Sequence, residues 1–232
     1  MTKNTALSEK KAVAEHDSGL SNISRRKFLN FAGASTGLVL LAACSKNDSG
    51  SGVDLGSGDI GILNYAYALE QLEAAFYIQV VAGSYYSSAS SDEKLYLKDI
   101  RDHEVAHREF FKAALGGSAI QALDVDFSSI NFGDRASVLG TAKAFEDLGV
   151  SAYNGAGSLI TNAAYLTVAG KIVSVEARHA ATIRDLISAD TFVGADVVDP
   201  TSGLEMSRTP TAVLSIAKKY IKTEINASNL PS

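Results

Sequence analysis

Apolar residues recur at helical spacing in five stretches of the chain, and little of the sequence alternates as a β-strand would. The stretches are Ile60–Val81, Lys94–Leu115, Arg135 to about Gly155, about Leu159 to Ser188, and Thr211–Lys222. The first four are long enough to form the helices of a bundle. The fifth is short and amphipathic, so we expect it on the outside of that bundle. The pattern therefore predicts an all-α fold.

The connections between these helices differ in length and composition. Residues 83–91 are small and polar, and Ser91, followed by two acidic residues, is expected to cap the second helix. Residues 118–133 form a much longer connection, after which Asp134 is expected to cap the third helix. A four-helix bundle needs such a crossover when neighbouring helices are not all antiparallel.

These boundaries predict one main domain. Residues 58–190 should form the four-helix bundle with its crossover connection, and residues 191–232 should add a polar loop and the short fifth helix. The first 57 residues do not show the pattern of a packed domain.

Ionisable residues interrupt the apolar stripe of two helices. Glu104 and His107 are three residues apart on one helical face, between Ile100 and Phe111. Glu176 and His179 repeat this arrangement in the fourth helix. Such a pair could also lie on a solvated face, but within an apolar stripe a carboxylate is costly unless it is paired or bound to a metal ion. The recurrence indicates a metal site.

The two halves of the predicted bundle share one pattern. Glu70 is followed seven residues later by Tyr77, and Glu146 is followed seven residues later by Tyr153. A Glu-x-x-His pair follows each of these glutamates on the next helix. Two helical hairpins related by a pseudo-two-fold axis would bring four glutamates and two histidines into one core. This ligand set is typical of bundles that hold two iron or two manganese ions.

The segments LNYAYALEQLEAAFY, IRDHEVAHREFFKAAL, AKAFEDLGVSAY and KIVSVEARHAATI together resemble the ferritin-like superfamily. The chain is most similar in pattern to ferritin-like domain proteins related to desiccation-associated proteins, and it shares helix patterns with rubrerythrin. It has no C-x-x-C pair and therefore lacks the rubredoxin iron centre of full rubrerythrins. The resemblance implies a ferritin-like four-helix bundle with two iron or manganese ions as cofactors.

The resemblance also implies a role for each candidate residue. Glu70 with His107 would bind one metal ion, Glu146 with His179 would bind the other, and Glu104 and Glu176 would bridge both. Tyr77 and Tyr153 would lie beside these ligands, bonded to carboxylates or taking part in redox chemistry, unless they are ordinary core tyrosines. Two neighbours remain alternatives, because Glu73 could replace Glu70 as a ligand and His103 lies next to Glu104.

The N-terminal region resembles an export signal. Arg25 and Arg26 precede a short apolar run that ends in Leu-Ala-Ala-Cys44, which is similar to a twin-arginine signal with the lipobox of bacterial lipoproteins. Residues 1–44 would thus be the leader, Cys44 would carry the lipid, and residues 45–57 would be a flexible Gly/Ser-rich tether. The expected location is periplasmic or at the cell surface, with the membrane as a partner through the lipid anchor.

The charge distribution argues against nucleic acid as a partner. Residues 1–43 hold six of the 21 basic and three of the 26 acidic residues, so the remainder has 15 basic against 23 acidic residues and a net charge of −8. The expected function is reaction of the two-metal centre with dioxygen or hydrogen peroxide at the cell envelope. The alternatives are a non-catalytic lipoprotein that protects against stress or desiccation, and an iron-storing oligomer.

Overall fold

The computed structural model describes residues 52–232. Arg25, Arg26, Cys44 and most of the predicted tether lie outside the described residues. Among the helices that are described, none has the length and apolarity needed to cross a membrane.

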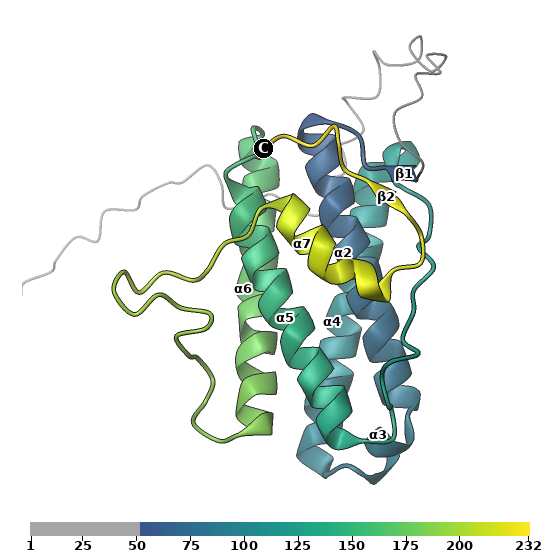
Figure 1. The fold of residues 1–232 in the computed structure, drawn as a ribbon, viewed down its shortest axis with the longest axis vertical. Helices are drawn as coiled ribbons and strands as arrows, with labels where there is room; N and C mark the ends of the chain where they lie inside the picture. The colour runs from purple at the N-terminus through teal and green to yellow at the C-terminus, as the bar shows by residue number, and fades with distance from the viewer. Residues whose placement is uncertain (1–51) are drawn as a thin grey trace, which may run out of the picture.

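Four long helices form a bundle (Figure 1). They are α2 (Gly58–Ala82), α4 (Ser91–Leu115), α5 (Arg135–Gly157) and α6 (Ala163–Ile187). Most contacts lie within two hairpins, in which α2 packs on α4 and α5 packs on α6. The prediction of an all-α four-helix bundle is confirmed, and each long helix extends over most of the stretch predicted for it.

The connections set the directions of the helices. A short helix, α3 (Ser84–Ser88), lies in the turn between α2 and α4. The connection from α4 to α5 begins with a 3-10 turn, η2 (Gly116–Ser118), and then runs the length of the bundle (Figure 1). It is held to α2 by Gln71, whose side-chain oxygen accepts a hydrogen bond from the Leu123 amide at 2.9 Å. Because of this crossover, α5 lies beside α2 and runs antiparallel to it.

Two helix starts differ from the prediction. Helix α4 is capped by Ser90 rather than Ser91, because the Ser90 hydroxyl accepts from the Glu93 amide at 3.2 Å. Helix α6 begins at Ala163 rather than near Leu159. Its cap is Asn162, whose backbone amide in turn donates to Asp59 at the start of α2. A tertiary contact therefore keeps the preceding residues out of the helix.

The start of α5 follows the prediction. The carboxylate of Asp134 accepts a hydrogen bond from the Ser137 amide at 2.7 Å, which is the geometry of a helix N-cap.

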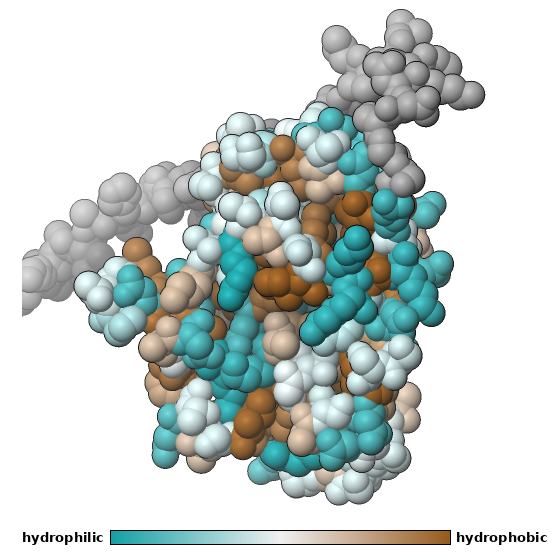
Figure 2. All heavy atoms as spheres, in the orientation of Figure 1, coloured by the Kyte–Doolittle hydropathy of each residue, from teal (hydrophilic) through white to brown (hydrophobic). Residues whose placement is uncertain are grey.

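The C-terminal region crosses the outside of the bundle. Helix α7 (Pro210–Ala217) is shorter than predicted, and a 3-10 turn, η3 (Lys218–Tyr220), follows it. Val213 and Ala217 are buried, and α7 lies across α5 and α2 (Figure 1). In Figure 2 this face shows hydrophobic residues in small groups between hydrophilic ones.

The folded domain begins before α2. Strand β1 (Val53–Asp54) pairs in parallel with β2 (Ile225–Asn226), and Leu55 is fully buried. The prediction of a flexible tether over residues 45–57 is therefore wrong for residues 53–55. Val53 and Asp54 pair with the C-terminal segment, and Leu55 enters the core.

Candidate metal centre

Six ionisable side chains converge in the middle of the bundle. They are Glu70 on α2, Glu104 and His107 on α4, Glu146 on α5, and Glu176 and His179 on α6. The four glutamates are at most 1% exposed, and His179 is 4% exposed. The structure thus brings together all six residues that the sequence pattern selected.

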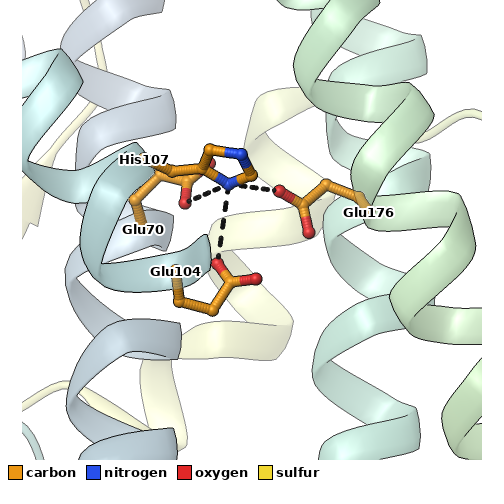
Figure 3. A group of neighbouring side chains, drawn as sticks. All are labelled: Glu70, Glu104, His107 and Glu176. Atoms are coloured by element: carbon orange, nitrogen blue, oxygen red, sulfur yellow. Dashed lines mark ion pairs between the residues drawn. The ribbon is translucent and has the colours of Figure 1, made fainter. Parts of the chain in front are cut away.

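The six residues form two overlapping groups that could each hold a metal ion. One group contains Glu70, Glu104, His107 and Glu176, whose side chains point toward one another in Figure 3. The second group contains Glu104, Glu146, Glu176 and His179. Within each group one ligand atom per residue lies within 4.8 Å of the others. Glu104 and Glu176 belong to both groups, as expected for carboxylates between two ions.

The distances are short around both imidazoles. His107 Nδ1 lies 2.9 Å from Glu176 Oε1 and 3.4 Å from Glu70 Oε2. His179 Nδ1 lies 2.8 Å from Glu104 Oε1 and 3.5 Å from Glu146 Oε2. The two halves of the centre are therefore closely similar, with one imidazole and one unshared carboxylate in each.

The oxygen and nitrogen atoms that face the middle of the centre are available to bind a metal ion. Both oxygens of Glu104 and of Glu176, one oxygen each of Glu70 and Glu146, and both Nδ1 atoms are buried without an aligned hydrogen bond. Burying polar atoms without such a bond destabilises a folded protein. Here the short distances between imidazoles and carboxylates offset part of that cost. Carboxylate oxygens and imidazole nitrogens that converge in this way fit iron or manganese.

The protonation of these groups reflects their mutual contacts. Burial raises the pKa of Glu104 well above its usual range, and the neighbouring charge of Glu176 raises it further. For Glu176, burial alone would raise the pKa, but the imidazoles of His107 and His179 outweigh it and lower the pKa to about 2. Burial alone would lower the pKa of His107, whereas Glu176 and Glu70 raise it to about 11. Without metal, protons on the imidazoles balance part of the carboxylate charge.

Two tyrosines connect the halves of the centre reciprocally. The hydroxyl of Tyr77 on α2 donates to Glu146 Oε1 on α5 at 2.5 Å. The hydroxyl of Tyr153 on α5 donates to Glu70 Oε1 on α2. Each tyrosine therefore orients the carboxylate of the other hairpin, and the exchange follows the pseudo-two-fold repeat in the sequence.

His103 lies outside both groups but contacts one of them. Its Nδ1 lies 2.9 Å from His179 Nε2, and the two rings are stacked at an interplanar angle of 11°. His107 has no equivalent partner from α6, where Val175 occupies the matching position before Glu176. Sequence spacing placed His103 beside the ligands but contained no signal for this stacking, which depends on how α4 and α6 pack.

Glu73 is buried but belongs to neither group. It is 5% exposed, and a side-chain carbon added at Gly149 would lie 3.0 Å from its Oε1. Burial raises the pKa of Glu73 well above its usual range, and the charges of Glu104 and Glu146 add to this effect. Of the two candidates on α2, the converging residue is Glu70.

Comparison with known proteins agrees with the arrangement of helices and side chains. Residues 58–189 match the family model described as "Ferritin-like domain". No curated protein matches the chain. Because the family match spans more than half of the 232 residues and contains all six converging side chains, the chain belongs to the ferritin-like domain family.

Proposed function

We propose that the protein binds two iron or manganese ions between these six side chains and reacts with dioxygen or hydrogen peroxide. The observation that carries the proposal is the pair of overlapping groups that share Glu104 and Glu176, with their inward atoms buried and without aligned hydrogen bonds. The ions would supply redox chemistry when bound, since both metals accept oxygen and nitrogen ligands of this kind.

The side chains of the centre have distinct tasks in this proposal. Glu70 and His107 would hold one ion, Glu146 and His179 the other. The four carboxylates would balance the charge of two divalent ions, so the loaded core would contain little net charge. Tyr77 and Tyr153 fix the orientation of Glu146 and Glu70 through their hydroxyl groups. Burial of the centre keeps bulk water away from the reacting atoms.

Metal content tests the first part of the proposal. Mass spectrometry of the purified protein should find about two iron or manganese ions per chain, the number typical of this ligand set. The double variant Glu104→Ala/Glu176→Ala should lose both, because both residues belong to both groups. Glu109→Ala is the matched control, since Glu109 lies exposed on the same helix as Glu104. An unchanged metal content in the double variant would contradict the shared centre.

Turnover tests the second part. Protein loaded with Fe²⁺ or Mn²⁺ should consume dioxygen or hydrogen peroxide, and the double variant should not. Metal-dependent thermal stability without any turnover would instead support a non-catalytic role. The resemblance to desiccation-associated proteins makes stress protection the alternative in that case.

We also propose that the protein is exported and anchored to a membrane at the cell envelope. The support is the sequence of the leader, in which Arg25 and Arg26 precede an apolar run that ends at Cys44. Cell fractionation should find the protein with the membrane. Cys44→Ser should release it from the membrane, and Arg25→Lys/Arg26→Lys should retain it inside the cell. A Cys44→Ser protein that remains bound to the membrane would contradict the lipid anchor.

A further inference from the structure

An apolar cavity lies inside one end of the bundle. Its walls come from all four long helices, and they include Tyr65 and Leu69 on α2, Phe111 on α4, Ala152 on α5 and Ala169 on α6. This is the end where α2 begins and α5 ends (Figure 1). Most of the wall is buried, whereas Ile160, Val168 and Ala169 are half-buried. These three residues mark the side from which the cavity is reached.

The cavity adjoins one half of the candidate metal centre. Leu69 directly precedes Glu70, and Phe111 is one helical turn, or about 5 Å, beyond His107. Tyr153 lines the cavity with its ring and donates its hydroxyl proton to Glu70. A molecule in the cavity would therefore lie next to the Glu70–His107 half, separated from it by the side chains of one turn.

The size and the lining of the cavity restrict its occupant. The centre of a water-sized molecule could move through about 20 Å³, which is room for one or two small molecules rather than an extended substrate. Almost all of the lining is carbon. Apolar cavities of this kind exclude water and bind apolar gases. Hydrogen peroxide would lose its hydrogen bonds to water there without replacement, so the lining disfavours it.

The other end of the bundle repeats the same helices with larger residues at the equivalent positions. Ala152 and Ala156 lie six and ten residues after Glu146, and Phe76 and Val80 occupy the same positions after Glu70. Ala169 lies seven residues before Glu176, and Leu97 occupies that position before Glu104. Three alanines thus leave the cavity where the equivalent residues of the other end are larger.

The packing at that other end is correspondingly close. Phe76 contacts Phe145, with ring centres 5.0 Å apart, and Phe127 and Phe132 of the crossover pack on the same ring. Phe76, Val80 and Leu97 are fully buried. At the cavity end the equivalents of Phe76 and Phe145 are Ala152 and Leu69, which both line the cavity. The two halves of the centre therefore differ in what can approach them.

We propose that this cavity binds dioxygen and gives it access to the Glu70–His107 half of the centre. The reaction of dioxygen at the metal centre rests on the proposed function. The binding of an apolar gas in the cavity does not depend on it. The proposal selects dioxygen rather than hydrogen peroxide as the oxidant. Dioxygen would reach the centre from the end of the bundle where α2 begins.

Xenon tests the cavity without any metal ion. Crystals of the metal-free protein under xenon pressure should show xenon between Leu69, Phe111 and Ala156, and no xenon beside Phe76. The filled variant Ala156→Val/Ala169→Leu introduces the residues of the closed end and should lose this xenon. Ala156→Val alone is a milder replacement that should reduce the occupancy. Absence of xenon from the unmodified protein would overturn the proposal.

Oxidation kinetics test the access role. With Fe²⁺-loaded protein, the filled variant should react with dioxygen about tenfold more slowly, while its rate with hydrogen peroxide stays unchanged. Gly140→Ala is the control, because it enlarges a residue of α5 outside the cavity, where the added carbon meets nothing within 4 Å, and it should leave the dioxygen rate unchanged. An equal loss with both oxidants, or no loss, would overturn the access role. If the unmodified protein binds xenon but does not react with either oxidant, the proposed function fails and the gas site stands.

Discussion

The two buried imidazoles of the metal centre lie against carboxylates. His107 shows this clearly, since its Nδ1 lies within 3.9 Å of carboxylate oxygens from Glu70, Glu104 and Glu176. In the metal-free protein these contacts raise the pKa of His107 to about 11, although burial alone would lower it. A bound metal ion would take the place of that proton.

The raised pKa predicts how the stability of the metal-free protein depends on pH. Unfolded His107 has a pKa near its ordinary value of 6.5, so above that pH the folded state holds more protons than the unfolded state. This contribution to stability is complete below pH 6.5 and is lost as the pH rises toward about 11. Urea unfolding should therefore show a lower midpoint at pH 9 than at pH 6.

Two comparisons control this experiment. The metal-loaded protein should show a smaller loss over the same range, because its imidazoles carry no proton at Nδ1. His107→Gln should also reduce the loss in the metal-free protein. A midpoint that rises from pH 6 to pH 9 in the metal-free protein would contradict the assignment.

Glycine substitutions on α5 test the contact of Glu73 with Gly149. A side-chain carbon at Gly140 meets nothing within 4 Å, so Gly140→Ala should stabilise the helix by about 0.5–1 kcal/mol. At Gly149 the added carbon would lie 3.0 Å from Glu73 Oε1, so Gly149→Ala should lose this gain and destabilise the protein. Thermal unfolding of the two variants measures the difference. Equal stabilisation by both would show that Glu73 moves freely.

At the scale of elements, the long loop after α6 depends on its contacts with α5. The Arg208 amide donates to the Ser151 carbonyl at 2.9 Å, and the Asn154 side chain donates to the Met206 carbonyl at 3.1 Å. Earlier in the loop, Asp196 accepts hydrogen bonds from Arg184, a 5% exposed residue of α6. These contacts hold the loop along the outside of α5 and α6.

Gly155→Ala should detach this loop without unfolding the bundle. The added carbon would lie 1.8 Å from the backbone oxygen of Arg208, which is far too close for both segments to keep their positions. Limited digestion with trypsin should then cut at Arg208 faster than in the unmodified protein, while circular dichroism keeps its helical signal. Gly170→Ala is the control, because its added carbon meets nothing within 4 Å. Equal digestion of both variants would contradict the contact.

At the scale of the whole molecule, the two ends of the described chain close the fold together. Strand β1 pairs with β2, with Val53 opposite Ile225, and Leu55 is completely buried behind this pair. Asn64 of α2 fixes the same region, since its side-chain nitrogen donates to the Leu55 carbonyl at 3.1 Å. The domain therefore depends on residues before its first long helix.

Leu55→Ala should destabilise the whole domain by about 2–5 kcal/mol, the usual cost of truncating a buried leucine. Ser57→Ala is the control, because Ser57 is exposed and makes no side-chain cap bond to α2. Chemical unfolding followed by circular dichroism measures both. A loss below about 0.5 kcal/mol for Leu55→Ala, which is typical of surface positions, would mean that this segment is not part of the core.

Local patterns in the amino-acid sequence were enough to predict the long helices, the crossover and the set of converging side chains. Helical periodicity is local, so the stripes that contain Glu104 and Glu176 are visible without any tertiary contact. The repeat of Glu70 and Tyr77 at Glu146 and Tyr153 then indicated which side chains would meet, and the cap at Asp134 followed from chemistry within one turn.

Features that depend on residues far apart in the chain became visible only in the folded domain. The pairing of Val53 with Ile225, which corrects the predicted tether, joins two segments that carry no strong strand signal. The stacking of His103 on His179 depends on the packing of α4 against α6. The cavity depends on whether side chains from four helices fill one space, and three alanines are too small to do so. Periodicity assigns a residue to the core, but the volume left between helices is known only when all of them are in place.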